Sequence, residues 1–212
     1  KHVSMARYYP EGTIVSSGLS KWCGAGGGRL GHFAFPKKLY WLKDAMASIA
    51  SETYSCVAVP IQHAAVVAYK DKETVDEYLF HCRRTLSIIG NFCANTLTDS
   101  GINVKAPAGA YYLYLDFEPF SNSLSNKEIF NSTDMCEQLL QDTGVALLPG
   151  LAFGSTAEEL NARLAYVNFD GGDALSTSRG IANDKDLTIA DLGDNVNLVK
   201  QGIENILNWI NN

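Results

Sequence analysis

The chain has 212 residues, of which 46% are hydrophobic and 19% are charged, so it can bury the core of one large domain or of two modest ones. Its formal net charge is −6, and its 17 lysines and arginines are scattered along the sequence. Nucleic-acid-binding surfaces are usually basic, so this composition argues against a nucleic-acid partner.

Cysteine usage and hydropathy argue against further classes. The five cysteines form no CxxC pair, and their odd number and irregular spacing indicate neither a disulfide framework nor a zinc site. A reducing compartment, the cytoplasm, is therefore expected. The four histidines, His2, His32, His63 and His81, show no metal-ligand spacing and are predicted to be structural. No apolar run reaches the roughly 18 to 20 residues of a membrane span, and the sequence from Lys1 lacks a signal-peptide pattern, so no membrane association is expected.

The first third of the chain predicts two strands and two helices. Strands are expected at residues 13–17 and 29–35, on either side of a glycine-rich stretch at 18–31. A helix should follow at about 36–48, because apolar residues recur there at helical spacing and proline is tolerated in a first turn. A second helix is expected at about 61–69.

The next segment predicts the longest helix, from Glu73 to Asp99. Its apolar residues repeat at steps of three and four from Val75 to Leu97, and Gly101 supplies a stop signal. At 1.5 Å per residue this helix would be about 40 Å long, which suits an element that bridges two domains. We therefore expect one domain over residues 1–100 and a small C-terminal domain over residues 101–212.

The remaining sequence predicts strands and helices in alternation. Strands are expected within residues 104–117, at 145–148 and at 163–169, and helices at 134–142 and 196–210. Residues 170–195 are polar, rich in glycine and aspartate and weakly periodic, which predicts a loop. Strands and helices alternate in both parts of the chain, so the predicted class is α/β.

The stretch from Gly18 to Gly31 holds one lysine and one arginine among glycines and small or apolar residues. Such a segment is poorly suited to a core, and it is suited to holding an anionic cofactor. Lys21 is therefore the first candidate for chemistry, although a lysine in a Gly/Ser-rich loop is most often simply solvated.

The full pattern, Gly-Leu-Ser-Lys, then Gly24-Ala25, then Gly27-Gly28-Arg29-Leu30-Gly31, resembles the cofactor-lysine signature of class I and II pyridoxal-phosphate aminotransferases. The resemblance continues at Gln62, in Pro107-Ala-Gly-Ala-Tyr-Tyr, in Pro-Gly-x-x-Phe-Gly at 149–154 and at Ala162-Arg163-Leu164. It implies an α/β fold of pyridoxal-phosphate fold type I: the C-terminal part of the large domain around the lysine, a long connecting helix and a small α/β C-terminal domain.

The resemblance also implies a role for each site residue. Lys21 would bond to the cofactor aldehyde and later act as the base that moves the substrate α-proton. Arg29 would pair with the cofactor phosphate, with Ser20 as a further phosphate contact, and Arg163 would grip the substrate α-carboxylate. Gly18 stands three positions before the lysine, where a serine that contacts the phosphate is usual, so this contact is either lost or kept by a neighbour.

A homodimer is implied as well. Tyr54 and Ser55 fall where relatives often contribute to the neighbouring subunit's site, although a packed loop tyrosine is an equally good interpretation of Tyr54. No arginine lies just before them, which weakly disfavours an aspartate-type substrate. Tyr111 and Tyr112 are predicted to be core or interface aromatics.

The implied function is a ping-pong transfer of an amino group between an amino acid and a 2-oxo acid. Family members are about twice as long, and several cofactor-binding parts of their N-terminal half have no counterpart here. We therefore expect the C-terminal half of such an enzyme, and the resemblance does not imply that this half is active alone. Alternatives are a pyridoxal-phosphate-dependent lyase or cyclopropane-forming synthase of the same fold, and a non-catalytic structural or dimerisation fragment.

Overall fold

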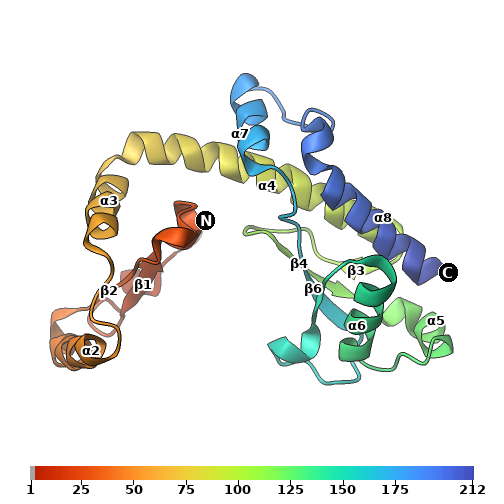
Figure 1. The fold of residues 1–212 in the computed structure, drawn as a ribbon, viewed down its shortest axis with the longest axis horizontal. Helices are drawn as coiled ribbons and strands as arrows, with labels where there is room; N and C mark the ends of the chain where they lie inside the picture. The colour runs from red at the N-terminus through yellow and green to blue at the C-terminus, as the bar shows by residue number, and fades with distance from the viewer. Residues whose placement is uncertain (1–2) are drawn as a thin grey trace. The chain divides into compact units, whose positions relative to one another are not determined.

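The computed structural model describes residues 3–212, so the expectations for Lys1 and His2 lie outside the described residues. The chain divides into two compact units, one up to Leu79 and one from Phe80 to Asn212, and the division falls within the helix α4, Lys72–Asp99 (Figure 1). The organisation expected from the sequence, 1–100 and 101–212, stays a prediction. Among residues 3–212, no helix combines the length and the apolar character that crossing a membrane requires.

The first unit contains a two-stranded antiparallel hairpin and two longer helices. Strand β1, Val15–Gly18, pairs with β2, Gly31–Ala34, so both predicted strands are present but shorter than expected. The remaining elements are η1 (Met5–Arg7), α1 (Leu19–Trp22), η2 (Gly26–Gly28), η3 (Lys37–Leu39), α2 (Tyr40–Thr53) and α3 (Val59–Lys70). The α-helix predicted from Pro36 begins four residues later, because a single 3₁₀ turn follows the proline.

Apolar side chains of this unit are mostly exposed. Of its described hydrophobic residues, only Leu19 and Ala65 are buried. Large apolar side chains are exposed on α2 and α3 above all: Tyr40, Trp41, Met46, Ile49, Val59, Val66, Val67 and Tyr69. The unit therefore has little hydrophobic core of its own.

The second unit is built on a four-stranded antiparallel sheet of order β3-β4-β6-β5. Its strands are β3 (Asn103–Val104), β4 (Tyr112–Asp116), β5 (Leu148–Pro149) and β6 (Asn161–Ala165). The predicted strand at 145–148 is wrong for residues 145–147. The strand predicted at 163–169 instead covers 161–165, which places Arg163 in the middle of β6.

Helices cover this sheet and enclose one hydrophobic core. They are α4, α5 (Ser121–Asn126), α6 (Ser132–Thr143), α7 (Gly171–Gly180) and α8 (Asn197–Asn211), with short 3₁₀ turns η4 (Glu118–Phe120), η5 (Gly150–Phe153) and η6 (Gly193–Val196). Figure 1 shows α8 alongside the C-terminal part of α4. The predicted final helix is confirmed, and its apolar residues Val199, Ile203, Ile206 and Ile210, which recur at helical spacing, are buried.

The predicted long helix is confirmed within one residue at its start, and its predicted apolar repeat is buried at Ile89, Cys93 and Leu97 but only half-buried before Ile89. Buried residues begin at His81 and recur every four positions through Thr85, Ile89, Cys93 and Leu97. The first two are polar, so an apolar pattern could not identify them. Burial raises the pKa of the Cys93 thiol to about 12, which keeps this core cysteine protonated.

Helix α7 corrects the prediction of a loop over 170–195. The Asp170 carboxylate caps its N-terminus by accepting a hydrogen bond from the Asp173 amide at 3.0 Å. Ser178 on α7 is fully buried and lies 2.9 Å from Nδ1 of His81. These stabilising contacts are polar, so they leave no apolar periodicity in the sequence.

Candidate functional site

Lys21 lies on a single helical turn at the end of the β1–β2 hairpin, not in the extended loop that its glycine-rich surroundings suggest. The turn is α1, whose first residue, Leu19, is 4% exposed and anchors it. The Leu19 amide donates to the Leu30 carbonyl at 3.1 Å, and the Ala25 amide donates to the Leu19 carbonyl at 3.1 Å. Two hydrogen bonds thus close the segment, and the Lys21 side chain is exposed on it.

Arg29 lies on the opposite arm of the same closed segment. Its backbone is left-handed, with φ of +50°, and its Nη1 donates to the Gly26 carbonyl at 3.2 Å. Arg29 directly precedes Leu30, and Ser20 and Lys21 directly follow Leu19, so the Leu19–Leu30 hydrogen bond brings the backbone at these positions close. One end of the hairpin therefore carries a lysine, a serine and an arginine.

The hairpin holds Gly18, at the position where a serine is usual, close to its opposite arm. Gly18 pairs with Gly31, and a Cβ on Gly18 would lie 2.9 Å from the Leu30 carbonyl oxygen. That contact is too short for a side chain without a shift of backbone. Ser20, which is half-buried, is then the nearest hydroxyl to Lys21 in the sequence.

Aromatic contacts support this segment from α3 and the start of α4. The rings of Trp22 and Tyr69 lie 5.0 Å apart, and the Tyr69 hydroxyl lies 3.3 Å from Nδ1 of His32. Gly24 has a φ of +64°, and a Cβ there would lie 2.5 Å from the Tyr78 hydroxyl oxygen. Only glycine therefore fits this position without movement of Tyr78.

Arg163 lies in the second unit, on β6, one of the two inner strands of the sheet. It pairs with Tyr114 on one side and Leu148 on the other. Its guanidinium carbon lies over two aromatic rings, 4.3 Å from the Tyr112 centroid and 4.4 Å from the Phe153 centroid. The sequence predicts Tyr112 to be a core or interface aromatic, and it gives Phe153 no role beyond its place in the Pro-Gly-x-x-Phe-Gly motif, which was the available signal for this ring.

Tyr54 and Ser55 follow the last residue of α2 and are exposed. Both amides donate to the Ala50 carbonyl, at 3.1 and 3.0 Å, and Ser55 has a φ of +64°. The exposed ring of Tyr54, at 66%, is compatible with a contact outside this chain.

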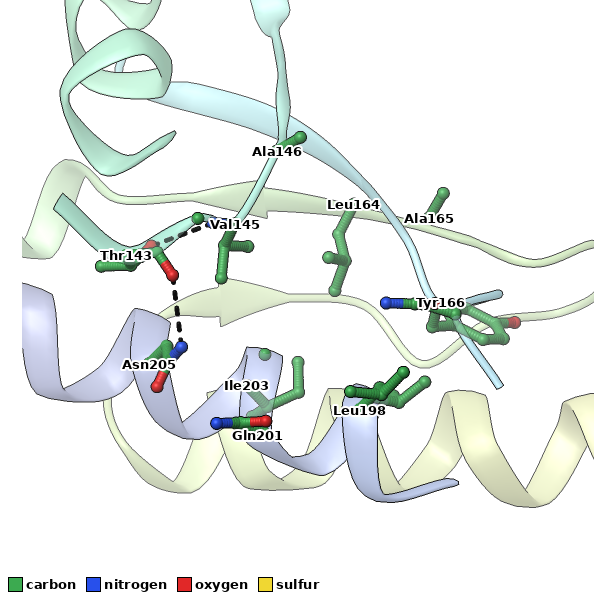
Figure 2. Close-up of a pocket in the computed structure, with 14 residues that line it drawn as sticks. Thr143, Val145, Ala146, Leu164, Ala165, Tyr166, Leu198, Gln201, Ile203 and Asn205 are labelled. Atoms are coloured by element: carbon green, nitrogen blue, oxygen red, sulfur yellow. Dashed lines mark hydrogen bonds between the residues drawn. The ribbon is translucent and has the colours of Figure 1, made fainter. Parts of the chain in front are cut away.

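A separate cavity of about 460 Å³ lies between α8 and the segments around residues 143–146 and 164–166 (Figure 2). Tyr166 is its one ionisable lining residue, and burial raises the pKa of this hydroxyl to about 12. The hydroxyl donates to the Ala110 carbonyl at 3.2 Å, so the ring anchors the loop before β4. None of the predicted site residues lines the cavity.

Comparison with known families decides the assignment. The profile of the family described as aminotransferase class I and II matches residues 2–168. The chain belongs to this family. Membership confirms the resemblance inferred from the lysine motif and brings with it the cofactor of the class, pyridoxal phosphate.

Curated relatives of this chain are named aminotransferases. It is 32% identical to an aspartate aminotransferase of Rhizobium meliloti over 164 residues, covering 73% of this chain and 38% of the relative. It is 30% identical to an aspartate aminotransferase of Geobacillus stearothermophilus over 182 residues, covering 84% of this chain and 43% of the relative. The chain thus spans less than half the length of these relatives.

Solved structures confirm the predicted α/β fold class. A tetra mutant of Thermus thermophilus aspartate aminotransferase matches with a TM-score of 0.71 at 22% identity, covering 98% of this chain and 46% of that one. A Pyrococcus protein matches with a TM-score of 0.73 at 22% identity, covering all of this chain and 45% of that one. The fold is therefore that of the corresponding part of an aminotransferase.

The residues around Lys21 fit the cofactor of this aminotransferase family. An exposed lysine amine can bond to an aldehyde, and a guanidinium and a hydroxyl can bind a phosphate. The closed segment between Leu19 and Leu30 carries the three residues that supply these groups. The donor set therefore matches an anionic aldehyde such as pyridoxal phosphate.

Proposed function

We propose that the protein acts, within a complete aminotransferase fold, in the ping-pong transfer of an amino group between an amino acid and a 2-oxo acid. The observation that carries the proposal is the closed segment from Leu19 to Leu30, which carries both Lys21 and Arg29. The segment is held by the buried side chain of Leu19, by the close approach of Gly24 to Tyr78 and by two backbone hydrogen bonds. Two cations on an ordinary surface would not need such support.

Each proposed site residue has a defined role. Lys21 would hold the cofactor through its Nζ until the amino group of the substrate displaces it, and the freed amine would then move the α-proton of the substrate. Arg29 and Ser20 bind the phosphate, where a guanidinium can form two parallel hydrogen bonds. Arg163 binds the substrate α-carboxylate through its in-plane N–H groups. The electron-accepting ring that this chemistry needs is supplied by pyridoxal phosphate.

We further propose a cytoplasmic homodimer, in which Tyr54 and Ser55 contact the site of the neighbouring subunit. The exposed apolar side chains of α2 and α3 support an interface, because large apolar surfaces are usually covered. The five cysteines are free, which fits a reducing compartment.

Cofactor binding gives the test of this function. The purified protein mixed with pyridoxal phosphate is expected to develop the absorption of a lysine-bound cofactor, and Lys21→Ala should abolish it. Lys38→Ala, an exposed lysine of the same unit, is the matched control and should retain it. The experiment is run on this chain and on the complete protein, since the chain spans less than half the length of its relatives.

The outcomes separate the alternatives. No absorption change with either protein would refute the enzyme and favour a structural or dimerisation role. A change with the complete protein alone would show that this chain lacks part of the cofactor site. When amino donors are then supplied, a 2-oxo acid formed in step with amino transfer indicates an aminotransferase, whereas release of ammonia or a cyclic product indicates a lyase or a cyclopropane-forming synthase.

A further inference from the structure

The Arg163 guanidinium is held in place by aromatic rings and not by a carboxylate. Its side chain is half-buried, and its guanidinium lies over the rings of Tyr112 and Phe153. Within residues 3–212 the guanidinium has no acidic partner and no hydrogen-bond acceptor. An arginine carries five N–H donors in one plane, so a half-buried one without acceptors is prepared for an external anion.

The two rings come from different parts of the second unit. Arg163 pairs directly with Tyr114 across the β4–β6 ladder, and Tyr112 lies two residues away from Tyr114 on the same face. Phe153 ends the turn η5, which follows β5, the neighbour of β6 on its other side. The guanidinium is therefore contacted by rings contributed from both flanks of its own strand.

A polar network fixes the turn that carries Phe153. The Asn161 amide nitrogen donates to Ser155 Oγ at 3.1 Å and to Glu159 Oε2 at 3.0 Å, and the Tyr114 hydroxyl donates to Asn161 Oδ1 at 3.1 Å. A Cβ on Gly150 would lie 1.5 Å from Asn161 Oδ1, so the turn sits directly on this network. The ring of Phe153 also makes an edge contact with Tyr114, with centroids 6.4 Å apart. Phe153 is thus held in place although 45% of its surface is exposed.

We propose that Tyr112 and Phe153 are positioning residues that hold the Arg163 guanidinium in the orientation that accepts a planar carboxylate edge-on. The inference rests on the proposed function, in which Arg163 binds the substrate carboxylate. The rings attract the cation through their π faces and occupy space around it, while its in-plane N–H groups stay available. A bidentate carboxylate contact needs this fixed plane, and a lysine ammonium cannot reproduce it.

Discrimination between an amino acid and the matching amine that lacks its carboxylate measures this role. In the complete, cofactor-loaded protein, the ratio of kcat/KM for the two compounds reports the carboxylate contact alone. Phe153→Leu and Tyr112→Leu are each expected to lower this ratio roughly three- to thirty-fold, the effect of losing one cation–π contact. Phe153→Tyr keeps the ring face and should keep the ratio. Phe130→Leu, an exposed phenylalanine of the same unit, is the matched control.

The variants also separate the two levels of the proposal. If Arg163→Gln lowers the ratio but neither leucine variant does, the positioning role is refuted and the proposed function stands. If Arg163→Gln leaves the ratio unchanged, the carboxylate role itself fails. If Phe153→Leu lowers kcat/KM equally for the amino acid and for the matching amine, the ring has a structural role and the inference is overturned. Should Tyr112→Leu fail to fold, the Phe153 pair decides, because this ring lies on a partly exposed turn.

Discussion

Gly24 shows how a single residue can shape the lysine segment. Its φ of +64° costs an L side chain about 1–2 kcal/mol, and a Cβ would meet the Tyr78 hydroxyl at 2.5 Å. Gly24→Ala should therefore lower the free energy of unfolding by at least this amount and weaken cofactor binding. Gly27→Ala is the control, because a Cβ there has no atom within 4 Å. Urea unfolding and a cofactor titration check the pair, and equal behaviour of the two variants would contradict the argument.

Glu159 makes a second prediction at the residue scale, for pH. The Thr156 amide donates to its carboxylate at 3.1 Å, and this hydrogen bond lowers the pKa of Glu159. A carboxyl with a lower pKa in the folded state stabilises the fold above its unfolded pKa and loses that contribution as pH falls through its folded pKa. Glu159→Gln should thus be less stable than the parent at neutral pH, with the gap closing in acid. The measurement is the unfolding free energy of the parent and of Glu159→Gln in urea, from neutral pH into acid. A constant difference between the two proteins over this range would refute the prediction.

Motif and geometry carried different information about the site residues. Lys21, Arg29 and Arg163 could be proposed from the sequence, because a motif depends on residue identity and spacing. Tyr112 was assigned to the core or an interface, since its place beside Arg163 follows from the register of β4 against β6. Register depends on contacts between segments about 50 residues apart, which a local pattern does not contain.

At the scale of elements, Arg84 connects α7 to α4. Its Nη1 donates to the carbonyls of Ser178 at 3.2 Å and Ile181 at 3.0 Å, and its Nη2 donates to those of Ala182 at 3.3 Å and of Lys185. These carbonyls lie at and beyond the C-terminus of α7, where helix carbonyls lack partners within the helix.

Replacing Arg84 should release this end of α7. Arg84→Ala is expected to cost about 1.5–3 kcal/mol of unfolding free energy, the range for hydrogen bonds to a charged group. Arg83→Ala removes the neighbouring, exposed arginine and serves as the matched control. Urea unfolding gives the energies, and hydrogen exchange shows whether α7 loses protection. Equal effects of the two substitutions would show that the carbonyl contacts add nothing.

The helices divide by how they are stabilised. The sequence predicted α4, α6 and α8, because each buries an apolar stripe at helical spacing. It missed α7, whose contacts with α4 include His81 and Arg84, and these leave no hydrophobic pattern. It also overextended β5, because the apolar residues 145–147 suit a strand but diverge from β6 beside the cavity in Figure 2. The spacing of apolar residues thus predicts which side chains are buried better than it predicts which strands pair.

At the scale of the whole molecule, the two units differ in how much they bury. The continuous core runs from Ile89 to Ile210, entirely within the second unit. The first unit, which carries Lys21 and Arg29, buries only Leu19 and Ala65 among its described hydrophobic residues. Since burial of apolar surface is the main stabilising term in folding, the second unit should be the stable part of this chain.

Hydrogen exchange on this chain tests that difference. Amides of α4 from Ile89 to Leu97 and of α8 should exchange orders of magnitude more slowly than amides of α2 and α3, because slow exchange requires opening of a buried core. If the amides of α2 and α3 were equally protected, and if this protection persisted on dilution, the second unit would not be the more stable part of the chain. Protection there that falls on dilution would show instead that a second copy of the chain covers the exposed side chains of these helices, since an interface between copies dissociates with concentration.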